Sequence, residues 1–267
     1  MKKNNLIALV EGAAMIALAA VLSMITLVEM PFGGSITACS MLPIILLAYR
    51  RGTKWGLFTA LVYAVLQMFL GFNNLRYGTS FAAVCAIIFL DYIFAFVVLG
   101  LAGIFRNKIK SQTTGMLIGT VLCCFLRFLC HFISGCTVWA GVSIPEIGGM
   151  IYSATYNAAY MIPETIVTVA GVWYLSKMLE FRSENITTNR EKQPKITTIV
   201  EGIGILLIVA AIVFDSLYLF ANLQTEDGFS WAAISTINFT VPIIVTVAAV
   251  VIWLIAHFII KQIKSKA

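Results

Sequence analysis

Two ionisable side chains, Arg127 and His131, stand four residues apart in the otherwise apolar stretch RFLCHFISGCTVWAG. Residues at this spacing lie on one face of a helix, so we expect the guanidinium and the imidazole side by side. A second apolar stretch, CAIIFLDYIFAFVVLG, contains a single carboxylate, Asp91. An ionisable group inside a membrane span costs about 2.5–3.5 kcal/mol or more, which makes each of these residues a candidate for function.

A third stretch, IYSATYNAAYMIPE, adds polar aromatic side chains and an amide. Tyr152, Tyr156 and Asn157 follow one another at helical spacing, and Pro163 removes a backbone donor further along. A carboxylate accepts hydrogen bonds from an amine, an imidazole or an amide reads ring nitrogens and hydroxyls, and aromatic faces attract cations. The combination predicts an outward-opening pocket for a small, flat, cationic heteroaromatic ligand.

Composition predicts the elements that must position these groups. Of 267 residues, 60% are hydrophobic and 11% are charged, and the mean hydropathy is +0.95. Soluble domains carry about 25% charged residues. Apolar runs that are continuous rather than alternating predict helices that cross a bilayer core about 30 Å thick. We expect an all-α integral membrane protein with spans at about 5–28, 38–50, 53–72, 80–105, 113–137, 148–178, 196–221 and 232–260.

Lysine and arginine predict the orientation of these spans, because they gather on the cytoplasmic side of a membrane. Of the 18 basic residues, all but Arg76 and Arg127 fall in the termini and in alternate loops. We therefore expect a multi-pass protein with both its N- and C-termini in the cytoplasm. The net charge of +6 follows from this topology and indicates no nucleic-acid site.

The polar stretch RSENITTNREKQPK marks a boundary between two parts of the chain. We expect a six-helix substrate-binding membrane core at residues 1–182 and a polar cytoplasmic linker at 183–195. Two additional C-terminal transmembrane helices then form an extension at 196–267.

Motifs for catalysis are absent from the sequence. It contains no G-x-x-x-x-G-K-[ST], H-E-x-x-H or G-x-S-x-G, which excludes ATP hydrolysis by a P-loop and leaves no apparatus for intramembrane hydrolysis. The six cysteines show no C-x-x-C spacing, and we predict no metal site. The sequence predicts a solute-binding membrane protein that is not an enzyme and has no catalytic residue.

Structural explanations stay open for several of these side chains. Tyrosines and tryptophans near the ends of spans also serve as interfacial anchors. Arg127 also fits an ion-paired structural role, with Glu164 or Asp91 as its partner. Asp215 and His257, in the last two spans, could pair with each other. The convergence of polar groups from three separate spans favours a binding pocket.

Four stretches, in order along residues 5–180, resemble one family of membrane proteins. They are PFGGSITACSMLPIILLAYRRG, LDYIFAFVVLGLAGIFR, RFLCHFISGCTVWAG and YSATYNAAYMIPE. This core is similar to the thiamine-specific, substrate-binding S-components of energy-coupling factor (ECF) vitamin transporters. The resemblance implies a six-helix protein in a bacterial cell membrane that captures thiamine outside with high affinity. It also implies a transmembrane coupling subunit and two cytoplasmic ATPases as partners; ATP is used by those partners alone, and no cofactor is expected.

The resemblance also assigns roles to particular residues. The implied substrate-binding set is Asp91, Tyr92, His131, Gly135, Trp139, Tyr152 and Asn157. Within it, Asp91 holds the aminopyrimidine, Tyr92 and Trp139 stack on the rings, and Gly135 leaves room for the ligand. The implied lid loop is Gly33, Gly34 and Ser35, and the implied docking surface for the coupling subunit is Ala13 and Ala17.

The chain departs from the family pattern in three places. Asp91 stands where some members have glutamate, Gly34 offers no aromatic ring where some members have one, and residues 196–267 have no counterpart. Three other functions stay open. They are an S-component for another small heteroaromatic vitamin or a pyrimidine precursor, a proton-coupled secondary transporter in which Asp91 and His131 relay protons, and a membrane scaffold whose polar residues merely pair.

Overall fold

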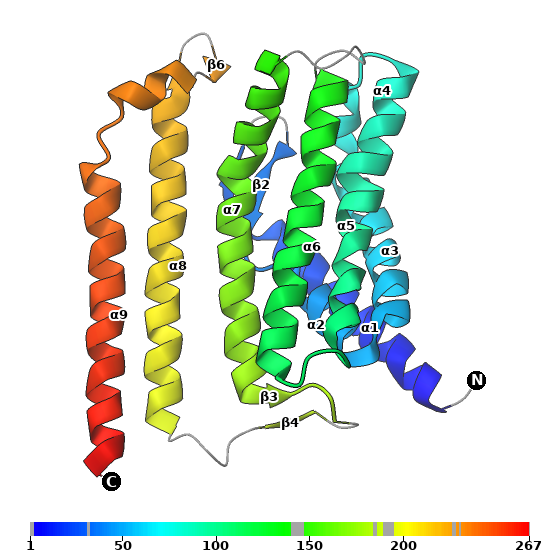
Figure 1. Ribbon diagram of the computed structural model, residues 1–267. Coiled ribbons are helices and arrows are strands. Elements are labelled where there is room, and N and C mark those ends of the chain that lie inside the picture. Colours follow the sequence, from blue (N-terminus) through cyan, green and yellow to red (C-terminus); the bar gives the residue numbers. More distant parts are fainter. Residues whose placement is uncertain are drawn as a thin grey trace. The chain divides into compact units, whose positions relative to one another are not determined.

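The computed structural model describes residues 3–30, 33–139, 147–183, 186–188, 195–225, 228–229 and 231–266. Helices dominate these residues, and their strands form three short antiparallel pairs (Figure 1). The chain divides into two compact units, Met1–Thr188 and Asn189–Ala267. The predicted all-α membrane fold is confirmed.

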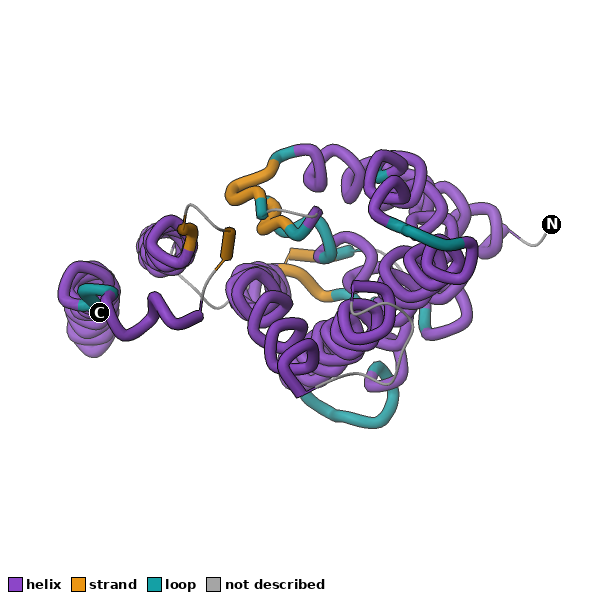
Figure 2. Tube along the Cα trace, turned by 90° about the horizontal axis from the view of Figure 1, so that it is seen from above, coloured by secondary structure: helices purple, strands orange, loops and turns teal. Residues whose placement is uncertain are grey.

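The first unit is a bundle of helices, most of which are seen end-on in Figure 2, with strand segments lying between them. Its helices are α1 (Lys3–Met24), α2 (Leu42–Arg51), α3 (Thr53–Leu70), α6 (Gln112–Ser134), which continues into the π-helical η5 (Gly135–Trp139), and α7 (Ile147–Met178). One composite helix is formed by α4 (Phe81–Ala86), η3 (Ile87–Phe94), α5 (Ala95–Val97) and η4 (Val98–Phe105). The shorter elements are β1 (Thr26–Glu29), β2 (Ser35–Thr37), η2 (Phe72–Tyr77), β3 (Leu179–Glu180) and β4 (Thr187–Thr188).

Seven helices within the described residues are long and apolar enough to cross a membrane. The predicted short second span corresponds to α2, which has ten residues and is therefore about 15 Å long, half of a hydrocarbon core. The antiparallel β1–β2 hairpin leads into it.

Four predicted boundaries differ from the structure by four residues or more: the first span ends earlier, the second begins later, and the last both begins and ends later. The first span ends at Met24 because the β-branched residues that follow favour the extended chain of β1. The last helix, α9 (Thr240–Lys266), begins well after position 232, since a 3₁₀ helix, η7 (Trp231–Thr236), precedes it. The Asn238 side chain accepts a hydrogen bond from the Thr240 N–H at 3.0 Å, as expected just before a helix start.

Close packing of α3 on η4 depends on glycine. A Cβ at Gly100 would lie 2.5 Å from the nitrogen of Leu57, and a Cβ at Gly56 would lie 2.7 Å from the carbonyl oxygen of Gly100. Small residues let helix backbones approach this closely, and close packing drives helix association in lipid. The contact holds the composite helix, which carries Asp91, against α3.

An ion-pair network connects α1 to the end of α2. Glu11 on α1 lies 3.1 Å from Arg50 and 2.6 Å from Arg51. Arg50, whose side chain is 6% exposed, also donates a hydrogen bond to the Ser183 carbonyl oxygen at 3.0 Å. A buried guanidinium requires such partners because its desolvation is costly. The network therefore fixes α1, α2 and the chain that follows α7 relative to one another.

The second unit is a hairpin of two helices, α8 (Lys195–Leu223) and α9, with the strand pair β5 (Gln224–Thr225) and β6 (Gly228–Phe229) between them. The Thr246 hydroxyl on α9 donates a hydrogen bond to Asp215 on α8. His257 instead packs beside Trp253, with 5.7 Å between the ring centroids. Asp215 thus takes a threonine partner rather than His257, because His257 lies about 16 Å further along α9 than Thr246.

Candidate functional site

A cavity of about 1030 Å³ lies between the helices of the first unit. Its wall is built by α1, α3, α6, α7, the β1–β2 hairpin and the composite helix. Nine residues of the sets implied by the sequence line it: Asp91, Tyr92, His131, Gly135, Tyr152, Asn157, Gly33, Gly34 and Ser35. The structure thus brings all four of the quoted stretches to one cavity.

The other three residues of those sets do not contribute to the described cavity wall. Trp139 ends η5, and its side chain lies outside the described residues. Ala13 and Ala17 are exposed on α1 and do not line the cavity. Gly12, beside them, faces inward, where a Cβ would lie 3.2 Å from the Thr59 hydroxyl.

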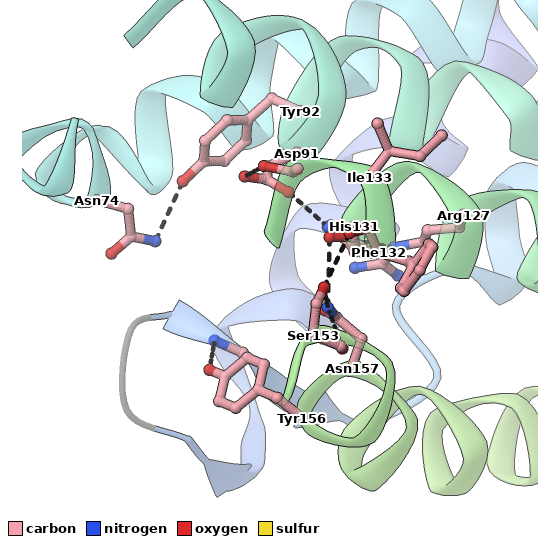
Figure 3. A network of polar contacts seen from close by, with 12 residues as sticks. Asn74, Asp91, Tyr92, Arg127, His131, Phe132, Ile133, Ser153, Tyr156 and Asn157 are labelled. Atoms are coloured by element: carbon pink, nitrogen blue, oxygen red, sulfur yellow. Dashed lines mark hydrogen bonds and ion pairs between the residues drawn. The ribbon is translucent and has the colours of Figure 1, made fainter. Parts of the chain in front are cut away.

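Asp91 lies at the centre of a polar network in the cavity wall (Figure 3). It belongs to η3, a π-helical segment of a kind that is frequent at functional sites. The Ser134 hydroxyl donates a hydrogen bond to its Oδ2 at 2.6 Å, and its Oδ1 lies 2.9 Å from Nδ1 of His131. Each carboxylate oxygen has a second lone pair, so Asp91, whose side chain is 23% exposed, still has acceptor capacity for a ligand.

The tautomer of His131 follows from its two neighbours. The Nε–H of Arg127, which keeps its proton in proteins, donates a hydrogen bond to Nε2 of His131 at 3.3 Å. Nε2 therefore carries the lone pair, and the proton of the neutral imidazole is on Nδ1, which donates it to Asp91. Because protein groups occupy both ring nitrogens, His131 orients Asp91 in this arrangement and offers no nitrogen to a ligand.

Arg127 is a buried cation, with 9% of its surface exposed. Its guanidinium carbon lies 4.4 Å from the centroid of the Phe96 ring, a cation–π contact. Within the described residues, its Nη1 has no hydrogen-bond partner and it forms no ion pair with Glu164 or Asp91. The ion pair that the sequence left open for Arg127 is not formed with either carboxylate, and an aromatic face and an imidazole contact the guanidinium instead.

Asn157 joins α7 to α6 through hydrogen bonds. Its Nδ2 donates hydrogen bonds to the carbonyl oxygens of Ser153, at 2.9 Å, and of His131, at 3.3 Å. Its Oδ1 accepts a hydrogen bond from the Tyr160 hydroxyl at 2.7 Å. The Ser153 hydroxyl adds a second link, to the Phe132 carbonyl oxygen at 2.8 Å. These bonds fix the spacing of the two helices on which the cavity wall depends.

Two glycines set how closely other elements approach α7. A Cβ at Gly135 would lie 2.2 Å from Oγ of Ser153, so the space beside this residue is filled by α7. A Cβ at Gly34 would lie 2.9 Å from the Tyr156 hydroxyl and from the Tyr160 ring. The Gly34 N–H donates a hydrogen bond to the Tyr156 hydroxyl at 3.3 Å. The segment predicted as a lid loop therefore packs directly on α7.

The aromatic side chains of the cavity wall have fixed orientations. Tyr92 donates a hydrogen bond to the Gly71 carbonyl oxygen at 2.8 Å and accepts one from the Asn74 side chain at 3.1 Å. The rings of Tyr152 and Tyr156 stack, with centroids 6.0 Å apart and an angle of 17° between their planes. Oriented ring faces along a cavity suit a flat ligand.

Four residues of this network were not singled out by the sequence: Asn74, Ser134, Ser153 and Tyr160. Helical spacing carries a signal for three of them. Ser153 precedes Asn157 by four residues, and Tyr160 follows Tyr156 by four. Ser134 lies three residues after His131 on the same helix face. Asn74 lies in a short connecting helix, and no spacing rule points to it.

Fold and cavity together define a class of protein. The chain is a multi-pass helical membrane protein that encloses a ligand-sized cavity, with an oriented carboxylate and aromatic faces, inside its bundle. Cavities between the helices of a bundle are common sites for small ligands.

Comparison with known proteins identifies the family. Residues 9–182 match the family model described as Thiamine transporter protein (Thia_YuaJ). The chain is 35% identical over 177 residues to the Thiamine transporter ThiT of Bacillus subtilis (strain 168), covering 62% of this chain and 88% of the relative. A relative of the same name from Lacticaseibacillus paracasei is 24% identical over 191 residues, covering 64% of this chain and 88% of the relative. The chain belongs to the thiamine transporter family.

A solved structure shows the same fold. ThiT from Listeria monocytogenes superposes with a TM-score of 0.52 at 24% sequence identity, covering 66% of this chain and 96% of that protein. The family match and the Bacillus subtilis relative confirm the resemblance inferred from four stretches of sequence, and with it the expectation that the protein is a transporter and not an enzyme.

The geometry predicts one tautomer of His131 in solution. The protein contains two histidines, so nitrogen-15 labelling of histidine gives a simple NMR spectrum, and His257→Gln assigns the second set of signals. We expect a protonated Nδ1 and an unprotonated Nε2 for His131, because the Arg127 Nε–H requires an acceptor there. Arg127→Met removes this donor and should weaken the preference, which then rests on the Asp91 acceptor at Nδ1 alone, while the His257 signals stay unchanged. A protonated Nε2 in the parent protein would contradict the arrangement.

Proposed function

We propose that this chain is the high-affinity thiamine-binding subunit of an ATP-driven vitamin importer. The observation that carries the proposal is the oriented carboxylate of Asp91, which keeps acceptor capacity in a cavity with aromatic walls. Membership of the thiamine transporter family supports thiamine as the ligand. Thiamine has an exocyclic amine on a pyrimidine ring and a permanently cationic thiazolium ring, and both features match the cavity.

The proposed binding residues are Asp91, Tyr92, His131, Gly135, Trp139, Tyr152 and Asn157. Asp91 accepts hydrogen bonds from the pyrimidine amine, and its negative charge offsets the charge of the thiazolium. Aromatic faces from Tyr92 and Trp139 hold the rings, at about 0.5–2 kcal/mol for a cation over a ring. His131 acts by orienting Asp91, whereas Gly135 and Asn157 act by setting the approach of α6 and α7.

The loop of Gly33, Gly34 and Ser35 is proposed to close over the bound ligand. All three residues line the cavity. Gly33 has a backbone φ of +97°, which favours glycine, and a Cβ there would lie 2.4 Å from the Asn74 side chain. The absence of a side chain at Gly33 therefore lets the loop lie against Asn74.

We propose that the energy for transport comes from partners, namely a transmembrane coupling subunit and two cytoplasmic ATPases. The chain lacks a P-loop motif, so it needs another source of ATP hydrolysis. Ala13 and Ala17 are exposed on α1, and side chains of this size let a partner helix approach closely in lipid. The alternation of basic loops supports a bacterial cell-membrane protein with N- and C-termini in the cytoplasm.

The organisation proposed for the chain is a six-helix binding core at 1–182, a polar cytoplasmic linker at 183–195 and a two-helix extension at 196–267. The end of the family match at residue 182 supports this division. We propose the core as the part that binds thiamine, because every residue of the cavity wall belongs to it.

Asp91→Asn is expected to weaken thiamine binding by about 1–3 kcal/mol, because the ligand amine loses a charged acceptor. This corresponds to a roughly 5- to 150-fold rise in Kd, measured by isothermal titration calorimetry on purified protein. Asp215→Asn makes the same exchange in the second unit and should leave the Kd unchanged. If the Asp91 variant binds thiamine as tightly as the parent protein, Asp91 is not part of the site.

Reconstitution tests the proposed division of labour. Proteoliposomes that contain this chain alone should bind radiolabelled thiamine without accumulating it, with or without a proton gradient. Vesicles that also contain the coupling subunit and ATPases of the same bacterium should accumulate thiamine when ATP is supplied, and ADP serves as the control. Accumulation by the chain alone under a proton gradient would instead establish a secondary transporter.

A further inference from the structure

Glu164 is a buried carboxylate to which the binding proposal gives no role. It lies on α7 directly after Pro163, is 1% exposed and does not line the cavity. Its Oε2 accepts a hydrogen bond from the Thr37 N–H at 2.6 Å, and its Oε1 accepts one from the Thr37 hydroxyl at 2.7 Å. Oγ of Ser40 lies 2.7 Å from Oγ1 of Thr37 and completes the cluster. A buried carboxylate requires such partners, so α7 is specifically joined to Thr37 here.

Thr37 is the last residue of β2, the strand that connects the proposed lid to α2. It lines the cavity, as do Gly33, Gly34 and Ser35 at the other end of the segment. The β1–β2 ladder shifts register between Thr26 and Val28, beside Thr37, which marks the inner end of the hairpin. The position of Thr37 therefore determines where the lid segment starts.

Helix α7 holds this hairpin at two levels. The outer contact is the hydrogen bond from the Gly34 N–H to the Tyr156 hydroxyl, at 3.3 Å. The inner contact is that of Glu164 with Thr37. Positions 156 and 164 are separated by eight residues, or about 12 Å along a helix. One helix thus contacts both the free end and the base of the hairpin.

The two contacts differ in strength. At the inner level, two short hydrogen bonds join one residue to a carboxylate in a fully buried place. The outer hydrogen bond is longer and has a phenol as its acceptor. Two short hydrogen bonds outweigh one longer bond, and leaving a buried carboxyl group without partners is costly. The inner end therefore stays in place when the outer end moves.

We propose that Glu164 is a positioning residue for the lid. It fixes the hairpin at Thr37, so that the segment Gly33–Ser35 opens and closes over the cavity about this point. The inference rests on the proposed function and names the residue that controls how long the ligand is retained. A hairpin fixed at one end loses fewer conformations when it closes, which favours the closed, ligand-retaining state. Glu164 acts through Thr37 and does not touch the ligand.

Three variants separate this role from a general effect on stability. Glu164→Ala removes both acceptors. Glu164→Gln can keep both hydrogen bonds to Thr37, one of them reversed. Its amide oxygen accepts from the Thr37 N–H, and its amide nitrogen donates to the Thr37 hydroxyl. Thr168→Val is the matched control, because Thr168 is 0% exposed one turn along α7 and its hydroxyl bonds only the Glu164 carbonyl oxygen, at 2.8 Å, among the bonds described for it.

The first measurement is hydrogen–deuterium exchange of residues 33–40 in the ligand-free protein. Glu164→Ala should raise exchange in this segment, whereas Glu164→Gln and Thr168→Val should match the parent. The second measurement is dissociation of radiolabelled thiamine after an excess of unlabelled thiamine is added. Glu164→Ala should release thiamine about tenfold faster or more, with little change in the association rate, and Glu164→Gln should restore slow release.

Parent-like exchange in Glu164→Ala, or parent-like dissociation despite faster exchange, would overturn the proposal. If Glu164→Ala does not fold, Thr37→Val replaces it, because it removes the hydroxyl that bonds Oε1 and should raise both rates. The exchange measurement needs no ligand. Failure of the parent protein to bind thiamine would therefore refute the proposed function alone, and the anchoring of the hairpin would still be tested.

Discussion

Polar side chains inside an apolar helix bundle need hydrogen-bond partners, because burying a polar group without one is costly. In this protein the requirement is met by a chain of contacts from Arg127 to His131, from His131 to Asp91 and from Ser134 to Asp91. Each step fixes the next: the guanidinium determines the imidazole tautomer, and the imidazole and Ser134 hydroxyl orient the carboxylate. The result is a carboxylate with fixed direction and spare lone pairs at a cavity wall.

The rest of the first unit holds the helices at the distances that these short contacts require. Glycines let the backbones of α3 and η4 approach each other and let the Ser153 side chain of α7 lie against η5. Asn157 joins α7 to the backbone of α6 at His131. On the other side of the cavity, α7 holds the β1–β2 hairpin through Glu164 and Tyr156. One helix therefore connects the carboxylate network with the proposed lid, although the two lie far apart in the sequence.

Local rules were sufficient to predict most of this arrangement. Hydrophobic run length predicts the helices, and four-residue spacing places Arg127 beside His131, as observed. Contacts between helices were harder to predict. The sequence offered Asp91 or Glu164 as partners of Arg127, whereas in the structure its guanidinium lies over the Phe96 ring. The β1–β2 hairpin was missed because an apolar, β-branched stretch that follows a helix looks like its continuation. The bonds between Glu164 and Thr37 cross 127 positions, and no local pattern predicts them.

The most direct test of the account is an experimental structure of the protein with thiamine bound. The account predicts thiamine in the cavity of the first unit, with its pyrimidine amine within about 3.2 Å of an Asp91 carboxylate oxygen. Nδ1 of His131 should remain on the same carboxylate. Thiamine bound outside this cavity, or bound inside it with its amine facing away from Asp91, would contradict the account.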